Sequence, residues 1–190
     1  MERTLPALLL PPAFRYNKIR LIDHSIRERR GIMGLEIERK FLVHKDRLPP
    51  LRGGTTIYQG YFSLDPSVRF RIIGENVYLT VKEYYHNGSR FELETEKNGI
   101  TEEEKAKLMM LAIVAPVVKT RYCLEFKGLI WEIDVYGGEN EGLITVDVEL
   151  PSMDYPLSFP SWVDANQEIT FEKKYSNQNL GASPYSQWSD

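Results

Sequence analysis

The amino-acid sequence predicts an α+β protein built mainly on an antiparallel β-sheet, with about eight strands and a few flanking helices. Apolar and polar residues alternate with a period of two in short segments, which is typical of strands that bury one face. Turn residues such as Asn87-Gly88 separate neighbouring segments and favour hairpins. At 190 residues, the chain is long enough for one well-packed domain with a single core.

The predicted strands follow one another along most of the chain. They cover residues 35–43, 56–64, 68–73, 77–84, 90–96, 117–125, 129–136 and 143–150. Residues 151–164 contain several prolines and are predicted to be irregular. Residues 167–175 are predicted to form a last extended piece.

One segment has a helical period. Thr101 and Glu104 form a capping box, and Leu108, Leu111 and Ala112 have the spacing of one apolar helix face. The helix is predicted to run from about residue 102 to about residue 114, before Pro116 stops it. Near the C-terminus, Ser176-Asn177 is predicted to cap a short second helix.

Composition and charge argue against several classes of function. A formal net charge of -3 provides no general field for holding nucleic acid, so no nucleic-acid partner is expected. The single Cys123 cannot form an internal disulfide, and the three histidines lack the spacing of zinc ligands. The apolar patch Ala7–Leu10 is too short for a membrane span or a signal peptide. We therefore expect a cytoplasmic protein that does not bind membranes.

The chain divides into three predicted parts. Residues 1–33 mix prolines with basic residues and show no regular period, which predicts an extension that is disordered or lies upstream of a natural start near Met33. Residues 34–181 form the predicted folded domain. Residues 182–190 form a polar tail.

Six predicted strands carry like charges two residues apart, so that each pair lies on one strand face. The pairs are Glu36/Glu38, Arg69/Arg71, Glu92/Glu94, Lys119/Arg121, Glu132/Asp134 and Asp147/Glu149. Antiparallel sheets commonly present a charged face to water. A purely solvated face has no reason to place like charges together, however, because they repel each other. The segregation of charge by strand therefore favours a functional surface.

Acidic and basic rows on one surface indicate a ligand that needs both. The first predicted strand illustrates this, because Glu36, Glu38 and Lys40 share one face and Ile37 and Phe41 share the other. Arginine and lysine suit phosphate oxygens, whereas carboxylates suit Mg²⁺ or Mn²⁺ better than zinc. Burying so many charges is costly unless a ligand pairs with them. A polyphosphate bound through divalent metal meets these requirements.

The sequence also resembles the CYTH superfamily, the triphosphate tunnel metalloenzymes. Residues 36–40 read Glu-Ile-Glu-Arg-Lys and match its ExExK signature. The resemblance continues in order to about residue 181, through motifs at 58–61, 68–71, 79–82, 90–94, 119–122, 131–134, 147–150 and 175–177. It implies an eight-stranded antiparallel barrel, closed into a tunnel that binds triphosphate with divalent metal.

The resemblance also implies roles for individual residues. Glu36, Glu38 and Glu149 would hold a metal, with Glu92, Glu94, Asp134 and Asp147 completing an acidic shell. The substrate phosphates would contact Lys40, Arg69, Arg71, Lys82, Lys119, Arg121 and Lys174. Lys40, Lys174 and Tyr61 are the candidate catalytic residues, and Lys173 is an alternative to Lys174. Asp147 departs from the family, in which glutamate is usual at this position.

The short bacterial members of the superfamily are inorganic triphosphatases, which cleave tripolyphosphate to diphosphate and phosphate. A metal-held water would attack in line while basic residues and metal neutralise the phosphoryl group. A carboxylate or the metal-bound water itself would take up the proton. The alternatives are a class IV-type adenylate cyclase that converts ATP to cyclic AMP, a thiamine triphosphatase, and a non-enzymatic module that binds polyphosphate or nucleotide triphosphate.

Overall fold

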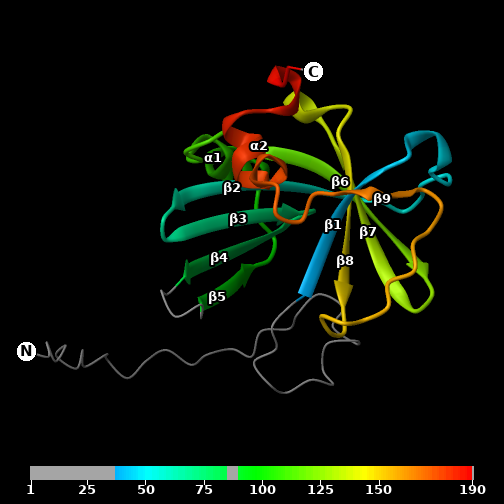
Figure 1. Cartoon of the computed structure of the whole chain (residues 1–190). Coiled ribbons are helices and arrows are strands. Elements are labelled where there is room, and N and C mark those ends of the chain that lie inside the picture. Colours follow the sequence, from blue (N-terminus) through cyan, green and yellow to red (C-terminus); the bar gives the residue numbers. More distant parts are fainter. Residues whose placement is uncertain (1–36, 85–89, 190) are drawn as a thin grey trace, which may run out of the picture. The chain divides into compact units, whose positions relative to one another are not determined.

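A computed structural model describes residues 37–84 and 90–189 and shows one antiparallel sheet (Figure 1). In these ranges the sheet has nine strands in the order β5-β4-β3-β2-β6-β7-β8-β1-β9. The strands are β1 Ile37–Val43, β2 Thr55–Leu64, β3 Ser67–Ile73, β4 Asn76–Tyr84, β5 Arg90–Lys97, β6 Val117–Phe126, β7 Leu129–Tyr136, β8 Ile144–Leu150 and β9 Val163–Glu168. The two α-helices in these ranges are α1 Glu102–Met110 and α2 Asn177–Ala182.

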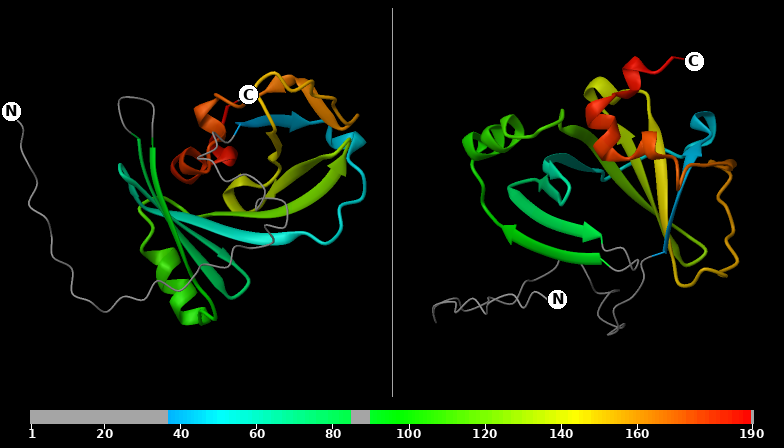
Figure 2. Two further views of the ribbon diagram at one scale, coloured as in Figure 1. Left: turned by 90° about the horizontal axis from the view of Figure 1, so that it is seen from below. Right: turned by 60° about the vertical axis from the view of Figure 1, so that its left-hand side comes forward.

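The mainly antiparallel fold is confirmed, but the closed eight-stranded barrel is not. Strands β1 to β8 correspond to the eight predicted strands, and β9 is an additional one. Within the described ranges β5 and β9 are the two edges of the sheet, and no pairing joins them. The sheet nevertheless curls strongly, and α2 lies within the curl (Figure 2, left).

Strand β9 corrects the prediction for residues 151–175. Val163–Glu168 reads VDANQE and lacks apolar alternation, so its own sequence does not indicate a strand. It forms because it pairs with the second edge of β1, where Phe41 faces Glu168 and Val43 faces Val163. The predicted extended piece at 167–175 is right only for Gln167 and Glu168, which end β9, because the residues after them turn and form the 3-10 helix Lys173–Tyr175.

The convex face of the sheet carries the main apolar core, centred on the fully buried Phe41 and Trp131. The proline-containing segment that precedes β9 covers this face. Phe159 makes an edge contact with Phe41, with ring centroids 5.3 Å apart, and Trp162 lies 6.0 Å from Trp131. Such aromatic pairs add to the free energy gained by burial. The core therefore anchors β1, β7 and β8 beneath this segment.

Helix α1 covers a second cluster on the convex face. Phe70 and Ile72 are fully buried beneath Leu108 and Ala112 of the α1 region. Gly60 permits this packing, because a Cβ at that position would lie 2.4 Å from the Phe70 ring. The helix thus fixes the arm of the sheet formed by β2, β3 and β4.

The N-terminal caps of both helices are confirmed. Thr101 accepts a hydrogen bond from the Glu104 amide at 3.1 Å and donates its own amide to the Glu104 carboxylate at 2.8 Å. Ser176 accepts a hydrogen bond from the Asn179 amide at 3.2 Å and begins α2. None of the helices in residues 37–84 and 90–189 is both long and apolar enough to cross a bilayer.

The predicted C-terminal end of α1 is wrong, because the helix stops at Met110 rather than at about residue 114. Tertiary hydrogen bonds replace the helical ones beyond that point. The amide of Ile113 donates to the carbonyl of Tyr61 at 2.9 Å, and that of Ala115 donates to Gly181 at 3.1 Å. The segment after α1 is thereby tied to β2 and α2.

We expect Glu168→Gln to weaken the attachment of β9 to β1 at neutral pH. Arg39 donates from Nε to the Glu168 carboxylate at 2.9 Å, and its hydrogen bonds lower the pKa of Glu168. A carboxylate with a depressed folded-state pKa stabilises the fold above its unfolded pKa and loses this effect as pH falls through the folded value. Urea unfolding at pH 7 should show a loss of about 0.5–1 kcal/mol that shrinks below about pH 4.

The matched control is Glu141→Gln, which removes an exposed carboxylate from the loop before β8. Its unfolding free energy should stay within about 0.5 kcal/mol of wild type at both pH values. A loss for Glu168→Gln that persists at low pH would contradict the ion pair as its cause.

Candidate active site

The strand register places the predicted charged residues on one face of the sheet. Charged and polar side chains lie opposite one another in two groups of adjacent strands, β1-β8-β7-β6 and β2-β3-β4-β5. Between the groups, Lys119 of β6 lies opposite Ile57 of β2. The register pairs include Glu38–Glu149, Lys40–Asp147, Glu132–Asp147, Arg121–Asp134, Gln59–Arg71, Tyr61–Arg69, Arg69–Thr80 and Thr80–Glu94. This charged face is opposite the aromatic core, because residues alternate between the faces of a strand. The expected gathering of acidic and basic rows on one surface is therefore observed.

The centre of the charged face is a buried ion-pair network around Asp134. This carboxylate is 0% exposed and accepts hydrogen bonds from Arg121 at 2.7 Å on each oxygen, and also from the Lys119 ammonium. Burial opposes ionisation of Asp134, but Lys119 and Arg121 hold its pKa well below the usual range. Burial lowers the pKa of Lys119 to about 8 against the attraction of Asp134, so both groups are charged at neutral pH.

Asp147 connects this network to the first strand. Its Oδ1 lies 2.8 Å from the Lys40 ammonium, and its Oδ2 lies 3.5 Å from Nη2 of Arg121. Burial disfavours the charge on Lys40, but the attraction of Asp147, with smaller contributions from Tyr136 and Asp134, raises the pKa of Lys40 overall. Two predicted phosphate ligands, Lys40 and Arg121, are therefore paired with carboxylates that the family resemblance assigned to the metal shell.

Glu38 and Glu149 form the acidic end of the site. They lie directly opposite each other on β1 and β8, and both are exposed. Partial loss of hydration between the strands raises the pKa of Glu38, and the charge of Asp147 raises it further. A divalent cation would relieve this repulsion, and carboxylate oxygens are the donors that Mg²⁺ and Mn²⁺ prefer. The donor chemistry of this pair therefore fits the expected metal.

The complete predicted metal set is not seen together. Glu36 and the side chain of Glu92 lie outside the described residues. Among the side chains that the structure does describe, no three Asp, Glu, His or Cys groups converge to hold a metal ion. Glu94 lies on β5, where it accepts a hydrogen bond from Thr80 at 2.8 Å. The metal shell implied by the resemblance remains a prediction.

The opposite arm of the sheet is basic. Arg69 donates to Thr80 at 3.0 Å, and Arg71 donates to the amide oxygen of Gln59 at 3.4 Å. The Gln59 amide nitrogen in turn donates to the Tyr61 hydroxyl at 2.8 Å. Burial, and then repulsion from the neighbouring arginines, lowers the pKa of Arg71 to about 10, so it stays charged at neutral pH. An anion bound here would reduce the repulsion among these cations.

A cavity of about 290 Å³ opens between this basic arm and α2. It is lined by Tyr61, Leu64, Asp65, Ser67, Arg69, Lys82 and Gln178. Three of the predicted site residues, Tyr61, Arg69 and Lys82, thus share one cavity. Its size is near the lower end of the range for small-molecule sites.

Two relatives of known sequence identify the family to which this chain belongs. An inorganic triphosphatase of Acetivibrio thermocellus is 39% identical over 156 residues, which cover 80% of this chain and 97% of that protein. The chain belongs to the family of these inorganic triphosphatases. A Nitrosomonas europaea inorganic triphosphatase is 33% identical over 155 residues, covering 78% of this chain and 97% of the relative. No family model matches the chain.

Solved structures agree with this placement. The crystal structure of the inorganic triphosphatase NE1496 is 30% identical and has a TM-score of 0.60, covering 80% of this chain and 98% of that one. The CYTH resemblance found in the sequence motifs is confirmed.

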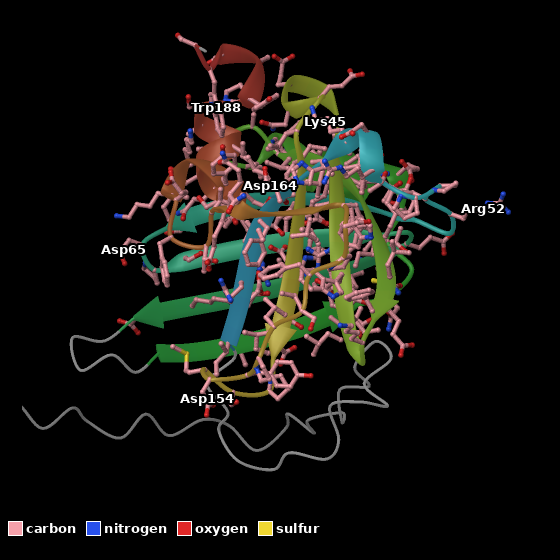
Figure 3. All side chains as sticks on the ribbon, turned by 45° about the vertical axis from the view of Figure 1, so that its right-hand side comes forward. Lys45, Arg52, Asp65, Asp154, Asp164 and Trp188 are labelled. Carbon is pink, nitrogen blue, oxygen red and sulfur yellow. The ribbon has the colours of Figure 1, made fainter. Side chains whose placement is uncertain are left out.

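Within this inorganic triphosphatase fold, Lys174 lies in an aromatic setting. Its ammonium is 5.0 Å from the ring centroids of both Tyr175 and Trp188. Trp188, labelled in Figure 3, also makes an edge contact with Tyr185 at 5.2 Å. These are cation–π distances, so the lysine is held by the C-terminal segment. The catalytic roles of Lys174 and of the exposed Lys173 stay predictions.

Five polar residues of the site were not among the sequence candidates: Gln59, Asp65, Ser67, Thr80 and Gln178. Gln59 and Thr80 lie two residues from Tyr61 and Lys82, so strand alternation alone places them on the charged face. Asp65 and Gln178 lie in a turn and in α2. No period in the sequence indicates that these two share a cavity.

We expect Asp134→Asn to destabilise the fold strongly. The change leaves Lys119, which is 2% exposed, and Arg121 without their full counter-charge. Removing one partner of a buried ion pair costs about 3–5 kcal/mol, which equilibrium unfolding in urea would measure.

The matched control is Glu132→Gln, because Glu132 contacts the same Arg121 but is 39% exposed. Its cost should be about 1 kcal/mol or less. Equal costs for the two variants would show that burial of the Asp134 network does not determine its contribution.

Proposed function

We propose that this chain is a divalent-metal-dependent hydrolase that cleaves inorganic tripolyphosphate to diphosphate and phosphate. The observation that carries the proposal is the register that aligns acidic and basic residues on one face of the sheet. Membership of a family whose curated members are named inorganic triphosphatases supports it. Phosphoryl transfer needs positioned charge rather than a side-chain nucleophile, and this face is rich in charge.

The basic residues are proposed to hold the phosphate chain. Arg69 and Lys82 line the cavity, and Arg71 lies one alternation deeper along β3. Lys40, Lys119 and Arg121 supply further positive charge on the same face. Tyr61 accepts a hydrogen bond from Gln59 at 2.8 Å, so its own O–H is directed by this contact toward other acceptors in the cavity. Lys174 is proposed as an additional phosphate ligand.

The acidic residues are proposed to hold Mg²⁺ or Mn²⁺. Glu38 and Glu149 supply the exposed carboxylates, and Glu36, Glu92, Glu94, Asp134 and Asp147 form the remaining proposed shell. When bound, the cation would neutralise phosphate charge and make a water more acidic. Lys40 and Arg121 would then bind phosphate oxygens as their carboxylate partners turn to the cation. The cytoplasmic location and the lack of a nucleic-acid partner remain predictions.

We further propose that the curled sheet closes into a tunnel around triphosphate. Cations on β3 and β4 and carboxylates on β1 and β8 occupy the two arms of the curl, so a metal-bound triphosphate would attract both. Small-angle scattering of wild type with Ca²⁺ and tripolyphosphate should show a smaller radius of gyration than the free protein. An unchanged scattering profile at saturating ligand would contradict closure.

We expect Glu38→Gln and Glu149→Gln to abolish metal-dependent turnover while the fold is kept. Both side chains are exposed, so the substitution costs little stability, but the loss of a carboxylate ligand removes transition-state stabilisation worth several kcal/mol. Phosphate release from tripolyphosphate should fall about 100-fold or more, with an unchanged urea midpoint.

The contrasting control is Ile37→Asp on the opposite strand face. Ile37 packs against the main core, and a buried unpaired charge there should unfold the domain. Loss of folding in all three variants would show that the acidic residues act structurally.

A substrate screen tests the proposed activity directly. Phosphate release is measured with tripolyphosphate, diphosphate, ATP and thiamine triphosphate, each with Mg²⁺ or Mn²⁺, and cyclic AMP is assayed in the ATP reactions. The highest kcat/KM is expected for tripolyphosphate. Efficient cyclic AMP formation with slow tripolyphosphate turnover would instead identify a cyclase, and tight binding without phosphate release would identify a binding module.

A further inference from the structure

The cavity beside α2 is lined by two cations and one carboxylate. Arg69 and Lys82 provide the cations, and Asp65 provides a carboxylate. Ser67 is the register partner of Lys82 and also lines the cavity. Asp65 is exposed in the turn between β2 and β3, at the end of the hairpin (Figure 3). The carboxylate of the cavity lining therefore lies at the turn end of the β2–β3 hairpin.

Three residues of β3 lie at regular intervals on the charged face of the sheet. Arg71, Arg69 and Ser67 occupy alternate positions on the charged face, roughly 7 Å apart along the strand. A phosphate chain lying along β3 would meet Arg71 and Arg69, then Ser67 with Lys82 opposite it on β4, and last the turn that carries Asp65. Gln178 of α2 lies across the same cavity and offers an amide without charge. The cations therefore precede Asp65 along this path.

We propose that Asp65 limits the length of the phosphate chain that this site accepts. The inference rests on the proposed function, because it takes the phosphate chain to lie against Arg69 and Lys82. An extra phosphate beyond the cations would approach a carboxylate instead of a counter-ion. Two like charges about 4 Å apart in water disfavour binding about five-fold. Asp65 is therefore a specificity residue for the chain end rather than a catalytic residue.

The test compares binding of tripolyphosphate and tetrapolyphosphate to the full chain by calorimetry, with Ca²⁺ in place of Mg²⁺ or Mn²⁺. Wild type should bind tetrapolyphosphate no more tightly than tripolyphosphate, despite its greater charge. Asp65→Asn should shift the ratio of the two dissociation constants about five-fold toward tetrapolyphosphate. Asp65→Glu, which keeps the charge, should retain the wild-type ratio.

The matched control is Asp154→Asn, which removes an exposed aspartate that does not line the cavity and lies away from Asp65 (Figure 3). It should leave the ratio unchanged. An unchanged ratio in Asp65→Asn, an equal shift in Asp154→Asn, or tighter binding of tetrapolyphosphate by wild type would each overturn the proposal. The wild-type comparison decides the matter even if a variant does not fold.

Hydrolysis assays separate this inference from the proposed function. Tripolyphosphate turnover by wild type with an unshifted binding ratio in Asp65→Asn refutes the role of Asp65 alone. Binding with the expected shift, but without turnover in Mg²⁺ or Mn²⁺, refutes the hydrolase and supports the length limit. Failure to bind either polyphosphate overturns both.

Discussion

The Asp134 carboxylate, which has no access to solvent, determines how the strands in the middle of this sheet pair. Asp134 pairs with both Lys119 and Arg121 from the adjacent strand, and the Lys119 side chain is only 2% exposed. Burial of an unpaired charge costs several kcal/mol, so this arrangement requires β6 and β7 to pair in one register. A slip by one residue would turn every charged side chain of a strand toward the aromatic core. The ion pairs and the hydrophobic face therefore select the same alignment.

The apolar core on the convex face of the sheet stabilises the fold enough to tolerate the charged face on the other side. Around Asp134, strand β7 is buried on both sides, with Trp131 and Ile133 at 0% exposure toward the core and Asp134 at 0% on the charged face. The aromatic packing of Trp131 against Trp162 supplies hydrophobic stabilisation. That stabilisation offsets the cost of removing ionised groups from water on the other side. A functional surface with closely spaced charges thus depends on the segment that covers the opposite face.

Much of this arrangement was predictable from sequence, because strand alternation has a fixed period. Alternation placed Lys119, Arg121 and Asp134 on one face, and the capping box located the beginning of α1. Strand β9 was not predictable, since its stability comes from the edge of β1 rather than from its own residues. The cavity position of Gln178 was likewise not predictable, because it depends on how α2 packs against the sheet.

The ion pairs themselves required the structure, and they constrain how the site can bind ligands. Sequence predicts which face Asp147 occupies, but the 2.8 Å contact with Lys40 depends on the pairing of β1 with β8. An anion that took Lys40 away from Asp147 would leave this buried carboxylate with only the more distant Arg121 as counter-ion. A cation that took Asp147 would leave the lysine unpaired in the same way. Each ligand therefore removes the cost that the other would incur, so phosphate and divalent cation are expected to bind this face cooperatively.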